Sequence, residues 1–280
     1  RYWTHQLSEA RALELPTDYP RSHDLSNRGS RYDFSLNASL TRALGQLNRQ
    51  EGVTMFMTLL AGFQVLLYRL SGEQDIVVGT DSANRTHLET EGLIGFFINM
   101  LVLRSQLSGK QSFLEVLQQV REMVLGAYMH QELPFEMVVE HLRLQRESNR
   151  TPLVNVLFVM QNVPSTHVEL PDLLISSFED KTTSAKFDLA LFVTEDSTGL
   201  HCSVNYRTDL FKDETIATLM RRYEALLHSS ITQPDMQIAS LELTTAAEKD
   251  RGQVTLLKTL RVRRGRHLQI SEKNGHQPDE

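Results

Sequence analysis

Apolar residues recur along this chain in two periods, which predict an alternation of helices and strands. The clearest helical stripe lies between residues 56 and 70, where apolar side chains stand at offsets 0, 3, 4, 7, 11 and 14: Phe56, Leu59, Leu60, Phe63, Leu67 and Leu70. Gly72 is expected to end this helix. Further stripes predict a helix capped by Ser39, one behind a Ser112–Glu115 capping box, one starting at Pro134 and one over residues 216–227.

Strands are predicted where apolar and polar residues alternate or where a short apolar run stands alone. These segments are residues 32–36, 75–80, 96–103, 154–161, 173–178, 186–195 and 199–207. A short helix is expected within residues 2–15, and Pro16 and Pro20 prevent it from continuing. The mixed order of elements predicts the α/β or α+β class with layered packing.

Composition narrows the class of protein. The chain has 280 residues, 40% hydrophobic and 23% charged, which is typical of a folded globular protein. Its net charge of −6 argues against a dedicated nucleic-acid binder. Cys202 is the only cysteine, which excludes an internal disulfide and fits a reducing compartment. The longest charge-free apolar stretch, residues 53–68, is shorter than a membrane span of ~20 residues, and the chain start has no apolar signal segment. A cytoplasmic location is therefore expected.

The usual catalytic signatures are missing from the sequence. It has no G-x-S-x-G elbow, no phosphate-binding P-loop and no H-E-x-x-H, and Cys202 is expected to be a small core residue. Residues 251–280 hold seven basic and three acidic residues, and we expect a loose tail there. Three segments combine charge, glycine and aromatic residues in an unusual way: residues 91–104, 130–136 and 146–153.

These three segments, in this order, resemble the later motifs of condensation domains of nonribosomal peptide synthetases. The family patterns read roughly I-G-x-F-(V/I)-N-T-x-x-x-R, H-Q-(D/E)-x-P-F-E and R-D-x-S-R-N-P-L. The first fits except at Met100, and the second fits fully. In the third, Glu147, Asn149 and Thr151 replace the family residues. Other segments that resemble the family are residues 52–60, 75–80, 83–85, 186–189 and 206–211, so that the likeness covers about residues 2–250.

The resemblance implies a chloramphenicol-acetyltransferase-like fold, in which two similar lobes form a V around a tunnel. Carrier proteins would bring an acyl donor and an aminoacyl acceptor as phosphopantetheine thioesters, and the acceptor amine would attack the donor carbonyl. The family's H-H-x-x-x-D-G motif is absent, since the sequence has no adjacent histidines and no Asp-Gly pair. The chain therefore resembles the C-terminal lobe. We expect residues 1–30 to be the end of the N-terminal lobe and a linker, residues 31–247 the C-terminal lobe, and residues 248–280 the tail.

Two polar residues are candidates for the substrate tunnel. Asn99 stands in an apolar run, and Asp188 stands between Phe187 and Leu189; each could instead bind structural partners. The other residues that match the family motifs are expected to be mainly structural: Gly95, Phe96, Arg104, His130, Gln131, Pro134, Phe135, Glu136, Arg146, Arg150 and Pro152. No catalytic residue and no metal ligand is predicted in this chain.

The expected activity is amide-bond formation by the parent domain, with this chain inactive alone. No cofactor is expected on the chain, and 4′-phosphopantetheine is expected on its carrier partners. The other expected partners are the N-terminal lobe and an adjoining adenylation domain, with no membrane or nucleic acid. Two alternatives stay open: an epimerization domain of the same fold, and a non-catalytic module that docks carrier proteins.

Overall fold

The structure is a computed structural model that describes residues 1–21, 26–85, 88–142, 151–161, 184–196 and 198–244. The chain divides into two units, Arg1–Glu242 and Leu243–Glu280, and every described helix and strand lies in the first. The predicted division of the chain at residues 30 and 247 stays a prediction. Residues 143–150, with Arg146 and Arg150, and the predicted strand 173–178 lie outside the described residues.

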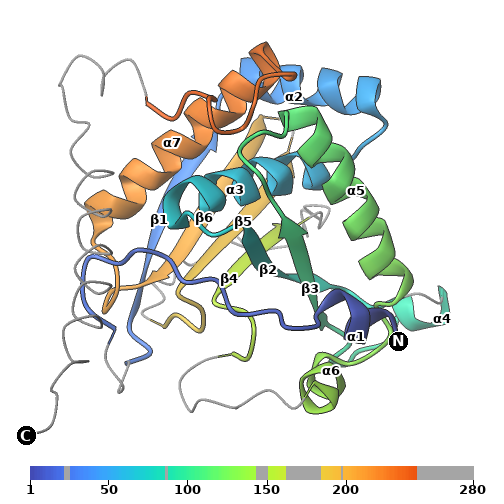
Figure 1. Ribbon diagram of the computed structural model, residues 1–280. Helices are drawn as coiled ribbons and strands as arrows, with labels where there is room; N and C mark the ends of the chain where they lie inside the picture. The colour runs from blue at the N-terminus through green and yellow to red at the C-terminus, as the bar shows by residue number, and fades with distance from the viewer. Residues whose placement is uncertain (22–25, 86–87, 143–150, 162–183, 197, 245–280) are drawn as a thin grey trace, which may run out of the picture. The chain divides into compact units, whose positions relative to one another are not determined.

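A mixed six-stranded sheet forms the centre of the first unit (Figure 1). Its strands are β1 (Gly29–Leu36), β2 (Asp75–Ser82), β3 (Asn99–Gln106), β4 (Val156–Gln161), β5 (Leu189–Asp196) and β6 (Gly199–Arg207). They are ordered β1-β6-β5-β4-β2-β3. Strand β4 runs parallel to both of its neighbours, and the other pairs are antiparallel. This confirms the predicted mixed α/β class.

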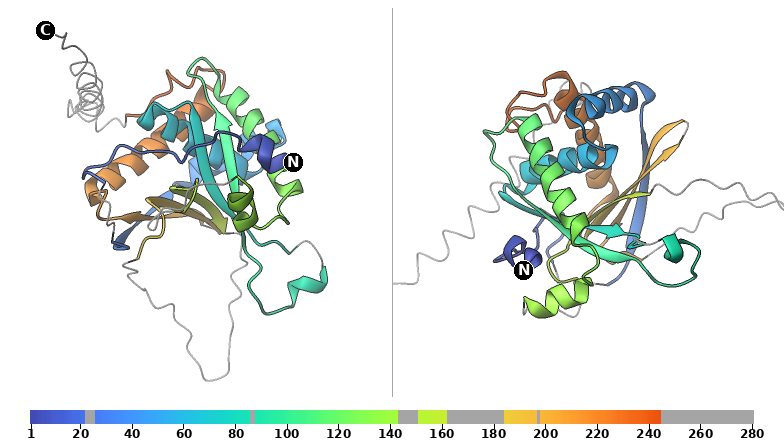
Figure 2. Two further views of the ribbon diagram at one scale, coloured as in Figure 1. Left: turned by 60° about the horizontal axis from the view of Figure 1, so that its bottom comes forward. Right: turned by 90° about the vertical axis from the view of Figure 1, so that its right-hand side faces the viewer.

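Long helices cover one face of this sheet (Figures 1 and 2). They are α2 (Ala38–Glu51), α3 (Met55–Ser71), α5 (Phe113–Met129) and α7 (Asp213–Thr232). Helix α3 contacts the other three and β2, which explains why it is apolar almost all round. The Phe63 ring lies against Phe158 of β4 and Tyr223 of α7, so the core continues from the sheet into the helices. The shorter helices are α1 (Tyr2–Gln6), α4 (Leu88–Glu91) and α6 (Phe135–His141).

Helix boundaries follow local capping chemistry. Thr54 and Gly72 bound α3, and the Ser112–Glu115 capping box at α5 is confirmed. The prediction of Ser39 as the cap of α2 is wrong, because the side chain of Asn37 accepts the Leu40 N–H at 2.8 Å. Pro134 stands one position outside α6, as its N-cap.

Two predicted elements have different limits. The first helix ends at Gln6, a turn follows at residues 7–9, and the chain then continues to Arg21 without a helix or strand. Strand β3 starts at Asn99 instead of Phe96, because the ladder with β2 ends where Ser82 pairs with Asn99. Phe96 is therefore 90% exposed instead of buried in the sheet.

No single helix in the described ranges is long and apolar enough to cross a membrane. Helices α2 and α3 reach the required length and composition only as a pair, and they are bent by 105°.

Candidate functional site

Asn99 joins the start of β3 to the loop between α5 and α6. Its Nδ2 donates to the carbonyl oxygens of Gln131 at 2.7 Å and Leu133 at 2.8 Å. Its Oδ1 accepts the Phe135 N–H at 3.0 Å. Both amide hydrogens are thus used, and the side chain is buried. These contacts hold the H-Q-x-x-P-F-E segment against the sheet.

The rest of that segment completes the same turn. The Ser82 hydroxyl donates to Gln131 Oε1, so the end of β2 is tied to this loop as well. Pro134 caps α6, Phe135 is buried behind it, and Glu136 occupies the first turn. The motif residues in this part of the chain therefore build a junction between β2, β3 and α6.

An apolar arm, residues 88–98, leaves this junction. Arg85 lies at its base, where Nη1 donates to the Thr90 carbonyl and Nη2 to the Leu93 carbonyl at 2.9 Å. The Arg85 guanidinium also lies 4.2 Å from the centroid of the Phe97 ring. The large apolar side chains that this arm exposes are Leu93, Ile94, Phe96 and Ile98. Figure 2 shows α4 projecting from the body. Gly95 is exposed within the same stretch.

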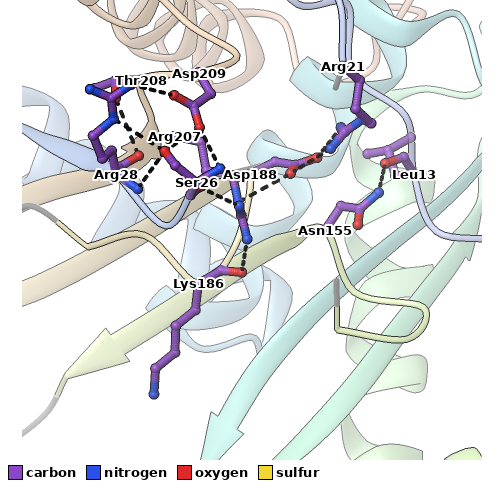
Figure 3. A network of polar contacts seen from close by, with 10 residues as sticks. All are labelled: Leu13, Arg21, Ser26, Arg28, Asn155, Lys186, Asp188, Arg207, Thr208 and Asp209. Carbon is purple, nitrogen blue, oxygen red and sulfur yellow. Dashed lines mark hydrogen bonds and ion pairs between the residues drawn. The ribbon is translucent and has the colours of Figure 1, made fainter. Parts of the chain in front are cut away.

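Asp188 is the centre of a second polar junction, drawn in Figure 3. It lies just before β5, is buried, and accepts from Arg21, with Nη1 at 3.0 Å from Oδ1 and Nη2 on Oδ2. Arg207 Nε lies 3.8 Å from Asp188 Oδ1. A buried carboxylate costs desolvation energy, which this forked geometry offsets. The carboxylate is thus engaged by arginines of this chain.

Arg207 extends the junction to the residues before β1. Its Nη1 donates to the Ser26 carbonyl at 3.0 Å, and its Nη2 donates to the Lys186 carbonyl at 3.1 Å. The Ser26 N–H donates to Asp209 Oδ2 at 2.9 Å. The start of β1, the start of β5 and the end of β6 are thus linked (Figure 3).

Two further motif residues, Arg104 and His130, contact residues 1–21, a segment here called the strap. Arg104 binds Asp75 through a two-pronged ion pair, which raises the Arg104 pKa, and its Nη1 donates to the carbonyls of Gln6 at 3.0 Å and Ser8 at 2.8 Å. The His130 ring stacks on Tyr2 with centroids 4.1 Å apart. Pro152 is half-buried in the turn before β4.

Two side chains with nucleophilic or basic chemistry, Cys202 and His130, are held in structural positions. Cys202 is 3% exposed, and burial raises its pKa to about 12, so the thiolate that would react is suppressed. His130 Nδ1 donates to the Gly126 carbonyl at 2.9 Å. Among the residues that the structure describes, no three His, Cys, Asp or Glu side chains group as metal ligands.

Three residues at these junctions were not singled out from the sequence. Arg21 stands in the segment predicted to be a linker, where no local sequence pattern indicates a buried ion pair. Asn155 interrupts an apolar run between Val154 and Val156, and such a polar residue is a signal that could have been used. Arg207 lies within a segment that resembles the family, but its role in linking the residues before β1 and β5 depends on contacts far along the chain.

One mixed sheet, covered by long helices on one face, has the layered packing that was predicted from the order of the elements. The described residues offer structural junctions and an exposed apolar arm.

Comparison with known proteins identifies the family. The family model described as Condensation domain matches residues 1–251. The chain is 41% identical over 250 residues to Chondramide synthase cmdD of Chondromyces crocatus, covering 89% of this chain and 6% of that protein. It is 40% identical over 254 residues to Phosphinothricin tripeptide synthetase PhsB of Streptomyces viridochromogenes, and the match covers 89% of this chain and 21% of that protein. The chain belongs to the condensation domain family of nonribosomal peptide synthetases, and it spans a small part of these relatives.

Solved structures agree on the fold. The X-domain from teicoplanin biosynthesis superposes with a TM-score of 0.81 at 28% identity, covering 87% of this chain and 56% of that one. A holo four-domain nonribosomal peptide synthetase bound to AMP and glycine gives a TM-score of 0.82 at 24% identity, and the match covers 89% of this chain and 20% of that one. The predicted family and the chloramphenicol-acetyltransferase-like fold are confirmed.

Proposed function

We propose that this chain is the C-terminal lobe of a condensation domain and that it works only together with an N-terminal lobe. One observation carries the proposal. The condensation model matches residues 1–251, yet the chain covers only 55% and 53% of two solved proteins of this fold. The absence of H-H-x-x-x-D-G from the sequence supports the same assignment.

In the proposed two-lobe domain, an amide bond forms between two carrier-bound groups. The acceptor amine attacks the donor thioester carbonyl, and the C–S bond breaks as the C–N bond forms. The nitrogen loses one proton, and the departing phosphopantetheine thiolate takes up one proton to become the thiol. This chain would supply one wall of the tunnel. Its arm would reach the other lobe, because Ile94 and Phe96 present apolar surface that the described residues leave exposed.

We assign structural roles to both tunnel candidates. The Asn99 amide is occupied by backbone groups of the loop between α5 and α6, and Asp188 by Arg21. Carrier proteins, an adenylation domain and a cytoplasmic location stay part of the proposal, with phosphopantetheine arriving on the carriers. Arg146 and Arg150 keep their predicted structural roles.

The decisive experiment offers the chain two loaded carrier proteins and measures amide product by mass spectrometry. The chain alone is expected to give no product above the protein-free control. Joining it to an N-terminal lobe of the family should produce turnover. A matched control with the second histidine of that lobe's motif changed to alanine should abolish it. Turnover by the isolated chain close to that of an intact condensation domain would contradict the proposal.

A further inference from the structure

The strap buries several apolar side chains although it forms almost no regular structure. After α1 it runs without a ladder to the sheet, yet Leu7, Leu13 and Leu15 are all buried. Figure 1 shows it crossing from the region of β3 and α6 toward the start of α7. A segment of this kind depends on discrete contacts instead of a continuous set of backbone hydrogen bonds.

Those contacts come from the body of the fold at well-separated points. Near the start, Trp3 Nε1 donates to the His130 carbonyl at 3.0 Å, and Arg104 holds two strap carbonyls. In the middle, Asn155 Nδ2 donates to the Leu13 carbonyl at 3.0 Å. At the far end, Asp18 Oδ2 accepts the Lys212 N–H at 2.8 Å.

The chemistry of these anchors suits a fixed position. The Arg104 guanidinium binds the Asp75 carboxylate and also donates to a strap carbonyl. The position of the strap is therefore fixed relative to both β2 and β3. Asp188 fixes Arg21 at the other end through two parallel contacts (Figure 3). The strap thus has hydrogen-bonded anchors near both ends and one between them.

We propose that Arg104, Asn155 and Asp188 are positioning residues for amide formation that act through the strap. They hold residues 1–21 in one register, and the strap in turn fixes the orientation of the N-terminal lobe that it joins. This inference rests on the proposed function, which places that lobe before the strap. Misplacing reacting groups by about 1 Å can reduce a rate a hundredfold, so an element that sets lobe orientation controls turnover.

The strap can be tested on the chain itself with a cysteine reporter. Leu13→Cys places a thiol at a position that is 2% exposed in the wild type, while the native Cys202 reports global unfolding. Thiol labelling is followed by mass spectrometry of the two peptides. Asn155→Ala removes the side-chain contact with the strap, and it should accelerate labelling at position 13 at least tenfold with no change at Cys202.

A matched variant and a second measurement keep this test decisive. Gln118→Ala removes a side-chain contact between α5 and Glu51, away from the strap, and should leave both labelling rates unchanged. If the Leu13→Cys chain does not fold, hydrogen exchange of the strap amides is measured in chains that keep Leu13. Exchange should be faster in Asn155→Ala than in the wild type and unchanged in Gln118→Ala. Parallel acceleration at both cysteines would overturn the inference, as would no acceleration at position 13.

The functional part is measured in a chain joined to an N-terminal lobe of the family. Asn155→Ala should lower kcat at least tenfold, leave the Kd for loaded carriers unchanged, and broaden the distance distribution between spin labels on the two lobes. An unchanged distribution alongside faster strap labelling would overturn the positioning role. Failure of the parent domain to form amides would refute the proposed function alone, because the labelling result does not depend on activity.

Discussion

At the scale of single residues, several buried polar side chains of the described residues bind backbone groups of this chain. Asn99 is the clearest case, since one amide binds three backbone groups of the segment that starts α6. Its motif position could be predicted from the sequence, but its role could not. A polar residue in an apolar run signals a buried hydrogen bond without revealing whether the partner is substrate or protein.

Replacing Asn99 with alanine should therefore act on stability. The Gln131 and Leu133 carbonyls and the Phe135 N–H lose their partner, and unsatisfied buried groups cost about 1–3 kcal/mol. Urea unfolding of Asn99→Ala should show a loss of that size. Gln106→Ala, exposed at the other end of β3, should change stability by less than about 0.5 kcal/mol. A large loss of turnover in the two-lobe domain without a loss of stability would refute the structural role.

At the scale of elements, the sequence determines helices better than the segments between them. The apolar stripe of α3 and the glycine after it are local signals, and they predict the C-terminal end of this helix to the residue. The courses of the strap and the arm could not be predicted, because they depend on partners far along the chain. Leu13 meets Asn155, and Arg21 meets Asp188, at sequence separations that no local pattern contains.

The start of α2 allows a direct test of capping. Asn37→Ala should cost about 1 kcal/mol of unfolding free energy, because the Leu40 N–H loses its acceptor. Ser39→Ala should have a much smaller effect, since the Ser39 hydroxyl only donates to the capping side chain at 2.6 Å. Equal losses in the two variants, measured by chemical denaturation, would mean that the cap is assigned to the wrong residue.

At the scale of the whole molecule, apolar side chains are exposed where the arm leaves the body. Asn99 ties the base of the arm to the loop between α5 and α6, and this region also exposes Met129, Leu133 and Met137. A monomeric protein rarely exposes large apolar patches, and such a patch favours association or a partner lobe. The isolated chain is therefore expected to self-associate.

Charges on the arm should suppress this association. The double variant Ile94→Asp with Phe96→Asp should sediment as a monomer over a wider range of concentration and bind less hydrophobic dye, with an unchanged Tm. Tyr19→Asp, an exposed aromatic position on the strap, serves as the control and should associate like the wild type. A wild-type chain that stays monomeric at high concentration and binds no dye would refute the expectation.

The sheet order also has a consequence for biosynthesis. Among the described strands, β1 pairs with β6 alone, and the paired residues Gly29 and Arg207 are 178 positions apart. At translation rates of about 5–20 residues per second, β1 leaves the ribosome about 9–36 s before β6 does. During that interval β1 is a nascent strand with both edges open. Recruitment of chaperones to the nascent chain should therefore begin when β1 emerges and end after β6 does.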